Sequence, residues 1–287
     1  MAHDMEDSRR RALIGLLTDF GDLDTYVGVM KAIIAGIAPS AAVIDLGHRI
    51  RPGDIRQAAF QLWQVADKFP AGSVLVVVVD PGVGTARRAV ACQWRQMVLV
   101  GPDNGVFTYL LAIESASAAV VLAEPRFHHT PVSATFHGRD IFAPVAAHLA
   151  GGTPLKELGP AANGLQQFEL PLLERLGADG LSGEVVHVDA FGNLITTLGR
   201  LRHDADGCAL APWLPKSEPG VFHGEGAALL PDGFELPLMT TFGDVAPGEP
   251  VAYLGSEGLL EIGVRGGSAA ERFALTVGAP IQLRFRG

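Results

Sequence analysis

The apolar run Val74–Val79, which ends directly at Asp80, is the feature that most constrains the fold. An unbroken run of this kind is typical of a strand buried on both faces, as in a parallel sheet. Ligands of open α/β sheets bind just beyond the carboxyl ends of such strands. The glycines Gly82 and Gly84 follow, and they let the backbone approach a ligand closely. We therefore expect Asp80 to lie in the functional site of the protein.

The first half of the chain alternates strand-like and helix-like segments. Apolar residues at helical spacing predict a helix from Asp24, as its N-cap, to Ile37, and a second helix that Asp54 opens. This alternation predicts a mostly parallel sheet with helices on both faces. The other expected elements are strands at 13–17, 43–46, 97–100 and 120–122 and a helix over 138–150.

The second half loses the helical period. Residues 151–180 are rich in glycine, proline and isolated charges, as in a connection between domains. Short strand-like segments separated by turns then predict a small β-barrel or sandwich, at 183–197, 251–254, 259–264, 273–277 and 281–285. We expect an α/β domain over residues 1–170 and a smaller all-β, barrel-like domain over 180–287.

Composition argues against several classes of protein. The net charge of −9 disfavours a broad nucleic-acid or anionic-membrane surface. Cys92 and Cys208 lie far apart without a CxxC motif, so neither a disulfide framework nor a zinc knuckle is predicted. Residues 1–11 lack the apolar core of a secretion signal, and no segment approaches the roughly 18 apolar residues of a membrane span. We expect a cytoplasmic protein without nucleic-acid or membrane partners.

Three carboxylates, Asp19, Asp22 and Asp24, follow the first predicted strand. Such a loop suits a polar ligand, because carboxylates bind vicinal hydroxyls and ammonium groups. It suits a helix cap with solvated loop acids equally well. A metal site at the same three residues is a further alternative, although no histidine nearby strengthens it.

Asp80 and Arg87 are spaced to form an ion pair across a turn, which by itself needs no function. Their position at a strand end favours a functional role for the two residues. His137 precedes Gly138 at a predicted helix start, where backbone amides favour anionic ligands. Asp189 to Asn193 forms a turn that, as a bare hairpin, needs no function. Walker A, GxSxG, HExxH and dinucleotide-binding glycine motifs are absent from the sequence.

Taken in order, six segments resemble the S-adenosyl-L-methionine (SAM) hydroxide adenosyltransferases, the adenosine-forming SAM hydrolases related to fluorinating and chlorinating enzymes. The resemblance runs from about Leu13 to the C-terminus. It implies an N-terminal α/β domain, a C-terminal β-barrel and a homotrimer, with SAM between one subunit's N-terminal domain and a neighbour's C-terminal domain. The segments are Thr18–Gly21, Asp80–Thr85, Gly101–Gly105, Phe136–Asp140, Phe191–Asn193 and Leu260–Ile262.

The resemblance implies a catalytic set of Asp80, Arg87 and His137. It also implies a substrate-binding set, in which one residue holds the ribose hydroxyls, others face the methionine ammonium and carboxylate, and others contact adenine. Asp19 would hold the ribose hydroxyls, Asp24 and Asp189 would face the methionine ammonium, and Ser256 would face its carboxylate. Phe191, Asn193 and the backbone of Ala269 would contact adenine. Phe136 and Glu261 complete the set.

The resemblance also separates hydrolysis from halogenation. Halogenases carry a long extra loop after the turn equivalent to Asp80–Arg87, whereas here Arg88 runs within nine residues into the Met97 strand. They have a non-acidic residue in place of Asp80 and a hydroxyl-bearing residue in place of Gly138.

We therefore expect hydrolysis of SAM to adenosine and L-methionine by water attacking ribose C5′, without a metal or another cofactor. A SAM-dependent halogenase, a non-catalytic SAM- or adenosine-binding protein, and a metal-dependent hydrolase are the alternatives. Whether Asp80 or His137 accepts the proton of water, and whether Arg88 assists Arg87, stays open.

Overall fold

A computed structural model describes residues 12–204, 207–215 and 217–286 of the chain. The expectation about residues 1–11 lies outside these described ranges. The chain divides into two compact units, Met1–Phe168 and Glu169–Gly287. The division falls inside the glycine- and proline-rich connection over residues 151–180.

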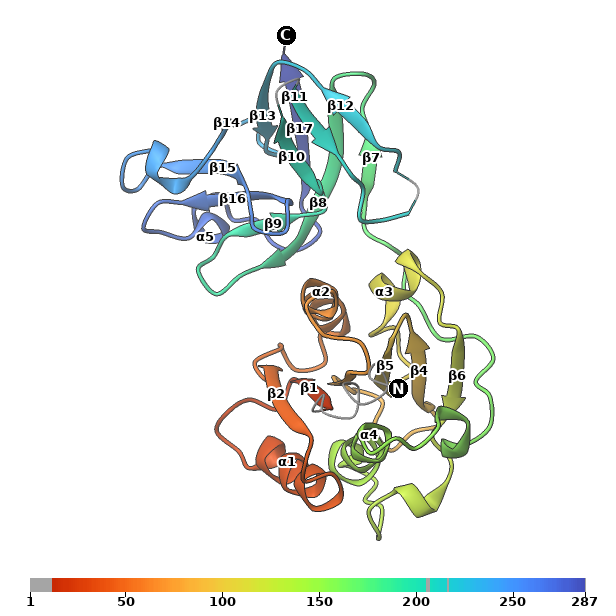
Figure 1. The fold of residues 1–287 in the computed structure, drawn as a ribbon. Coiled ribbons are helices and arrows are strands. Elements are labelled where there is room, and N and C mark those ends of the chain that lie inside the picture. The colour runs from red at the N-terminus through yellow and green to blue at the C-terminus, as the bar shows by residue number, and fades with distance from the viewer. Residues whose placement is uncertain (1–11, 205–206, 216, 287) are drawn as a thin grey trace, which may run out of the picture. The chain divides into compact units, whose positions relative to one another are not determined.

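The first unit is built on a six-stranded sheet of order β2-β1-β3-β5-β4-β6 (Figure 1). Strand β1 pairs in parallel with β2 and β3, and β3 pairs in parallel with β5, whereas β4 is antiparallel to β5 and β6. The predicted parallel-rich sheet is therefore confirmed. The strands are β1 (Leu13–Thr18), β2 (Ala42–Gly47), β3 (Val74–Val78), β4 (Ala89–Trp94), β5 (Met97–Pro102) and β6 (Ala118–Val121).

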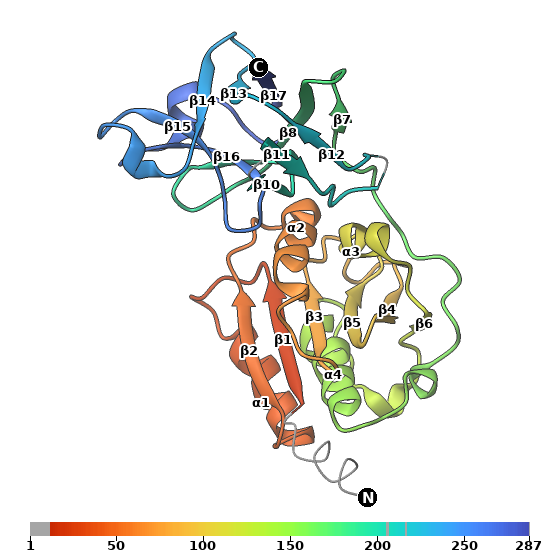
Figure 2. The same cartoon turned by 45° about the horizontal axis from the view of Figure 1, so that its top comes forward.

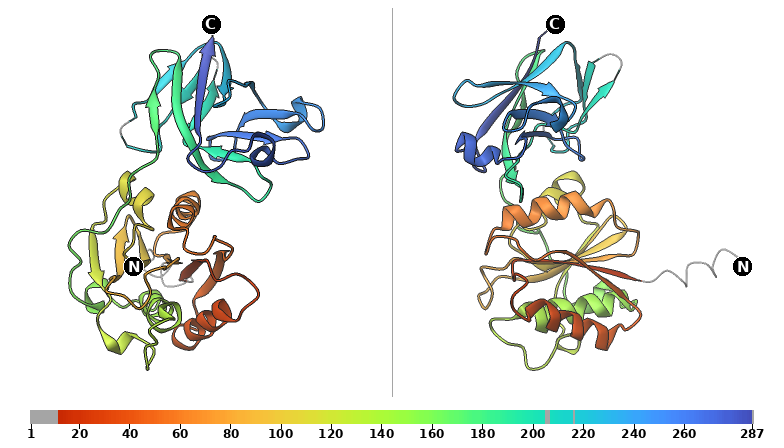
Figure 3. Two further views of the ribbon diagram at one scale, coloured as in Figure 1. Left: turned by 180° about the vertical axis from the view of Figure 1, so that it is seen from behind. Right: turned by 90° about the vertical axis from the view of Figure 1, so that its left-hand side faces the viewer.

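Helices cover both faces of this sheet (Figures 2 and 3). Helices α1 (Tyr26–Ile37) and α4 (Ala143–Ala150) pack together on one face, and α2 (Ile55–Ala66) and α3 (Thr108–Ile113) on the other. Alternate residues of β3 join the core beneath α1 and α4, because strand side chains point to opposite faces in turn. The short segments η2 (Pro125–Phe127), η3 (Gly138–Phe142) and η4 (Leu155–Leu158) complete the unit.

The helix starts match the sequence expectations only in part. Asp54 caps α2, since its carboxylate accepts the backbone N–H of Gln57 at 2.9 Å. The predicted Asp24 cap of α1 is wrong, because Thr25 occupies the N-cap position and no side chain caps this helix. The helix expected over 138–150 begins as the π-helical turn η3 and continues as α4.

The parallel pairing of β1 and β3 determines where polar side chains meet. Thr18, the last residue of β1, pairs with Val78, the last residue of β3. Asp19 and Asp80 therefore follow neighbouring strands at the same edge of the sheet.

The second unit contains a closed β-barrel. Its sheet has the order β17-β13-β14-β15-β16-β9-β8-β7, and β17 also pairs with β8, which closes the ring. A separate sheet joins β10, β11 and β12. The strands are β7 (Leu173–Arg175), β8 (Gly180–Val188), β9 (Leu194–Thr196), β10 (Leu201–Asp204), β11 (Gly207–Leu210), β12 (Gly220–Phe222), β13 (Glu225–Leu229), β14 (Glu235–Met239), β15 (Pro250–Leu254), β16 (Leu260–Val264) and β17 (Pro280–Arg286).

The strand predicted at 273–277 is wrong. The chain there leaves helix α5 (Ala269–Phe273), which Ser268 caps by accepting the backbone N–H of Glu271 at 3.1 Å. A further short helix, η5 (Phe242–Asp244), precedes β15. In the ranges that the structure describes, no helix has both the length and the apolar character that crossing a membrane requires.

Candidate active site

A pocket of about 380 Å³ lies where the loops after β1, β2 and β3 meet the segment before η3. Four of the predicted site residues line it: Asp19, Asp80, Phe136 and His137. The other lining residues are Phe20, Pro52, Gly53, Val78, Pro81, Val83, Thr135 and Gly138.

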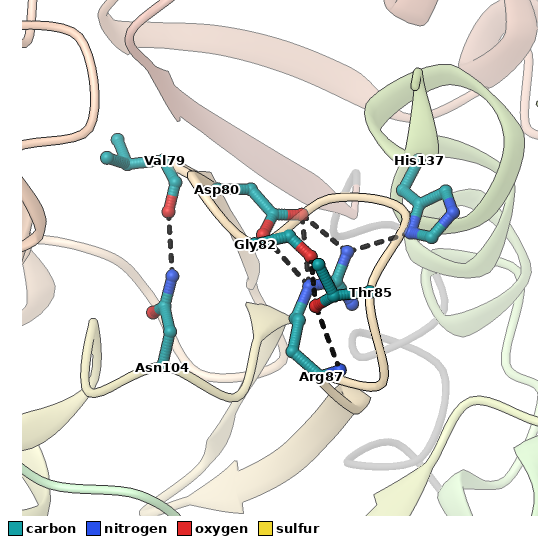
Figure 4. Close-up of polar contacts among 7 residues, drawn as sticks. All are labelled: Val79, Asp80, Gly82, Thr85, Arg87, Asn104 and His137. Carbon is teal, nitrogen blue, oxygen red and sulfur yellow. Dashed lines mark hydrogen bonds and ion pairs between the residues drawn. The ribbon is translucent and has the colours of Figure 1, made fainter. Parts of the chain in front are cut away.

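The structure brings Asp80, Arg87 and His137 together (Figure 4). Nε of Arg87 donates to Asp80 Oδ1 at 2.9 Å, and Nη2 of Arg87 donates to Asp80 Oδ2. The same Nη2 lies 2.7 Å from Nδ1 of His137. The side chains of Arg87 and Asp80 are only 9% and 6% exposed. A buried guanidinium thus joins a carboxylate to an imidazole.

The charge of Arg87 determines which ring nitrogen of His137 carries the proton. Arginine stays protonated in proteins, so its Nη2 donates and Nδ1 of His137 accepts. In the neutral imidazole the proton then resides on Nε2. Burial lowers the pKa of His137 and the positive charge of Arg87 lowers it further, while Asp80 and Asp140 oppose the change.

Backbone turns hold the Asp80–Arg87 loop in place. The Thr85 hydroxyl donates to the carbonyl of Gly82 at 2.7 Å and accepts the backbone N–H of Arg87 at 3.3 Å. Asn104 donates from Nδ2 to the carbonyl of Val79 at 2.9 Å, which fixes the strand end just before Asp80 (Figure 4).

Gly84 lets this loop touch the loop that carries His137. Its φ is +77°, and a Cβ there would lie 2.6 Å from the carbonyl oxygen of Ala134. Any larger residue at position 84 would therefore separate the two loops or strain the backbone.

Asp19 lines the same pocket and is held by the loop after β2. Its Oδ2 accepts the backbone N–H of Gly53 at 2.9 Å. Burial raises the pKa of Asp19, and the nearby Asp80 carboxylate adds to that change, although the Gly53 hydrogen bond opposes it. One residue earlier, Thr18 Oγ1 lies 2.9 Å from Nδ1 of the buried His48, whose Nε2 lies 3.0 Å from Asp45. This buried contact fixes the end of β1.

Arg88 lies apart from the Asp80 group, although it is next to Arg87 in sequence. Its Nε donates to Asp103 Oδ2 at 2.8 Å. Oδ1 of Asp103 accepts the backbone N–H of Gln166 at 2.7 Å. Arg88 therefore stabilises the segment that leaves the first unit.

In the second unit, three predicted residues gather at one end of β9, β15 and β16. Asp189 Oδ1 accepts the backbone N–H of Asn193 at 2.8 Å, and its Oδ2 accepts Asn193 Nδ2 at 2.8 Å. Glu261 accepts the hydroxyl of Tyr253 at 2.7 Å. Burial raises the pKa of Glu261, and Asp189 raises it further. The group combines two carboxylates with an amide, which suits ammonium and amide-edge recognition.

The remaining predicted residues differ in exposure. Phe191 is 79% exposed at the tip of the hairpin, and Ser256 is exposed in the turn between β15 and β16. Ala269 is buried at the start of α5, where the next residue donates its N–H to the carbonyl of Gly192 at 3.0 Å. In the first unit, Asp24 is exposed and does not line the pocket.

The metal alternative has no ligand set in the described part of the chain. No group of three or more His, Cys, Asp or Glu side chains converges there. Asp22 pairs with Arg49, and Asp19 accepts from Gly53.

Sequence reasoning missed Gly53 as a lining residue of the pocket and His48 as the partner of Thr18 at the end of β1. The available signal was the order of the strands. Because the strand ending at Gly47 is parallel to β1, its following loop reaches the same edge as Asp19. Gly53 and His48 belong to that loop.

Comparisons with known proteins agree along nearly the whole chain. The sequence model of the SAM hydroxide adenosyltransferase N-terminal domain matches residues 14–159, and that of the C-terminal domain matches residues 183–282. A (R)-S-adenosyl-L-methionine hydrolase of Thermus thermophilus is 45% identical, covering 93% of this chain and 97% of that protein. A fluorinase of an Actinoplanes species is 28% identical, covering 94% of this chain and 96% of that protein. A solved structure of a conserved Thermotoga maritima protein gives a TM-score of 0.82 at 34% identity, covering 94% of this chain and 99% of that one.

Proposed function

The chain belongs to the SAM hydroxide adenosyltransferase family, and on this basis we propose that it hydrolyses SAM to adenosine and L-methionine. The observation that carries the proposal is the Asp80–Arg87–His137 group at the pocket, in which the ion pair of Asp80 and Arg87 is nearly inaccessible to solvent. A carboxylate, a guanidinium and a neutral imidazole in contact are suited to orient and polarise one water molecule.

The reaction is a displacement at ribose C5′. The oxygen of water forms a bond to C5′ while the C5′–S bond breaks, and its electron pair stays on sulfur, so a neutral thioether leaves. One proton is released for each SAM consumed. Alignment of water and substrate supplies roughly 7–11 kcal/mol of such a barrier. SAM is the substrate, and we propose that no cofactor takes part.

The hydrogen bonds of Arg87 favour Asp80 over His137 as the proton acceptor. Nδ1 of His137 already accepts from Arg87, and Nε2 carries the imidazole proton. Each carboxylate oxygen of Asp80 keeps lone-pair capacity beyond its contacts with Arg87. Nη1 of Arg87 is buried without a hydrogen-bond partner among the described residues, so one donor of the guanidinium beside Asp80 is uncommitted. Asp80 is thus the proposed base and Arg87 the electrostatic partner.

The substrate-binding roles extend the proposal to both units. Asp19 holds the ribose hydroxyls in the first unit, with Phe136 forming part of the pocket wall. The second unit contributes Asp189, Asn193 and Glu261, with Phe191, Ser256 and Ala269 on neighbouring turns. Asp24 keeps its proposed role toward the methionine ammonium, although it lies outside the pocket lining.

The proposed assembly is a homotrimer, in which a neighbour's second unit completes each site. This part depends on the family resemblance, and light scattering of the purified protein tests it. The cytoplasmic location stays a prediction.

The surroundings of Gly138 support water rather than halide. A Cβ at this position would lie 3.2 Å from each of Met30 Sδ, Phe136 Cε2 and Phe20 Cε2. A hydroxyl-bearing side chain would need these neighbours to move. The site therefore offers little room for the residue that the halogenase resemblance requires.

The deciding experiment is incubation with SAM in oxygen-18 water, followed by chromatography and mass spectrometry. Adenosine with the label at O5′, together with L-methionine, is the expected result. A 5′-halo-adenosine formed with chloride or fluoride would establish the halogenase instead. SAM binding by calorimetry without any product would establish a binding protein. Activity that disappears with a chelator would point to a metal-dependent hydrolase.

A further inference from the structure

A buried carboxylate outside the pocket, Asp140, connects both ends of the loop that carries His137. Its side chain is fully buried. Oδ2 accepts the backbone N–H of Ser133 at 2.8 Å, and the Asp140 carbonyl accepts the backbone N–H of His129 at 2.8 Å. The pocket-lining stretch Thr135–Gly138 lies between these contacts and Asp140. The Asp140 side chain therefore anchors this stretch at Ser133, and the Asp140 backbone carbonyl anchors the segment before it at His129.

The same carboxylate also acts on the pocket wall through Arg139. Nε and Nη2 of Arg139 donate to Asp140 Oδ1 and Oδ2 at 2.6 and 2.9 Å. The Arg139 guanidinium then lies 5.2 Å from the ring centroid of Phe136, within cation–π range. Phe136 in turn contacts the ring of Phe20 edge-on, with the two centroids 5.7 Å apart. Asp140 thereby fixes an aromatic wall as well as the backbone.

We propose that Asp140 is a positioning residue, whose buried carboxylate holds the loop over residues 133–138 so that His137 meets Arg87 and Phe136 closes the pocket. The inference rests on the proposed hydrolysis of SAM. Asp140 does not line the pocket. A misplacement of about 1 Å at a reacting group costs up to about 10²-fold in rate, so loss of the clamp should act on kcat.

A second consequence is electrostatic and separates this role from a merely structural one. The charged and titratable groups that act on His137 are Arg87, Asp80, Asp140 and His128. Among them, Asp140 raises the pKa of His137. Neutralising Asp140 should therefore lower the pKa of His137. In a plot of kcat against pH, the fall of kcat on the acidic side should then move to lower pH.

The test compares Asp140→Asn with Asp103→Asn. Asp103 is a matched control, because it is also a buried carboxylate that binds an arginine and a backbone N–H, but it does not line the pocket. For Asp140→Asn we expect up to about a 10²-fold lower kcat, little change in KM, and an acidic limb at lower pH. In the Asp103 variant, the acidic limb of the pH dependence of kcat should stay at the wild-type pH.

Direct titration of the His137 imidazole by NMR gives a readout independent of turnover. A lower His137 pKa in Asp140→Asn is expected, and an unchanged pKa with unchanged kcat would overturn the inference.

If Asp140 variants do not fold, Arg139→Gln replaces them, because Arg139 is partly exposed. Wild-type kcat in that variant would equally overturn it. Failure of the wild-type protein to release adenosine would reject the proposed function, and the NMR titration would still decide the role of Asp140.

Discussion

Arg87 and Arg88 are adjacent in the chain, yet their guanidinium groups bind different carboxylates, Asp80 and Asp103. Arg87 lies at the end of the loop that begins at Asp80, and Arg88 is the residue before β4. Successive side chains in extended backbone point to opposite sides, which explains the separation. Separate substitutions of Arg87 and Arg88 can therefore test whether Arg88 assists Arg87.

Replacing Arg87 by lysine should nearly abolish adenosine release. One ammonium cannot reproduce the planar fork that contacts Asp80 and His137 together. We expect kcat to fall by about 10²–10³-fold, the range for losing one preorganised donor. Arg88→Lys is the control, and its kcat should stay close to wild type while its thermal stability falls. Equal losses of kcat in both variants would contradict the division of roles.

Asp80→Asn and His137→Gln should separate the base from its neighbour. Asparagine cannot take a proton, so kcat should fall by about 10²–10⁴-fold with SAM binding retained. Glutamine keeps an oxygen that accepts from Arg87, and its variant should retain more activity than His137→Ala. Stopped chromatographic assays and calorimetry measure both effects. If Asp80→Asn keeps activity that His137→Gln loses, His137 rather than Asp80 is the base.

Activity should persist below the pH at which an ordinary histidine becomes charged. A protonated His137 would direct an N–H toward the Arg87 guanidinium, so turnover requires the neutral imidazole. Burial and the Arg87 charge lower the pKa of His137. The acidic limb of kcat assigned to this group should therefore lie below about 6.5, the usual histidine value. His137→Gln should lose that limb, and an unchanged limb in this variant would assign it to another group.

Gly84→Ala should impair both stability and turnover. Alanine at a positive φ costs roughly 1–2 kcal/mol by itself, and here its Cβ would also meet the carbonyl oxygen of Ala134. Gly152→Ala is a matched control, since Gly152 has a φ of +92° and open space around its Cβ position. Chemical unfolding should show a larger loss for Gly84→Ala, and only this variant should lose kcat. Identical behaviour of the two variants would show that the loop contact is unimportant.

The parallel part of the fold could be predicted because its signals are local. The valine run of β3 and the Asp54 cap each specify their element within a few residues. Strand β4 escaped prediction because its turn gives no such signal. Trp94 pairs with Met97 across a two-residue turn, in which Arg95 adopts a φ of +50° without the usual glycine or asparagine. The helix at Ala269 was missed although Ser268 and Glu271 have capping-box spacing.

The contacts within the candidate site depend on topology that single motifs do not contain. Asp80 and Arg87 are seven residues apart, so their pairing could be anticipated. The contact of Arg87 with His137 spans fifty residues and exists because η3 begins beside the end of β3. The roles of His48 and Asp140 follow from buried hydrogen bonds, which no sequence pattern specified.

The π-helical turn η3 makes the orientation of His137 depend on chain length. Such a turn accommodates one residue more than regular α-helical geometry allows. Deleting one residue from Gly138–Phe142 would restore the α-helical repeat and rotate everything before it by about 100° around the axis of α4. The imidazole would then face away from Arg87 with every side chain of the group still present. Homologues that have gained or lost a residue in this segment should therefore differ in activity even where Asp80, Arg87 and His137 are all retained.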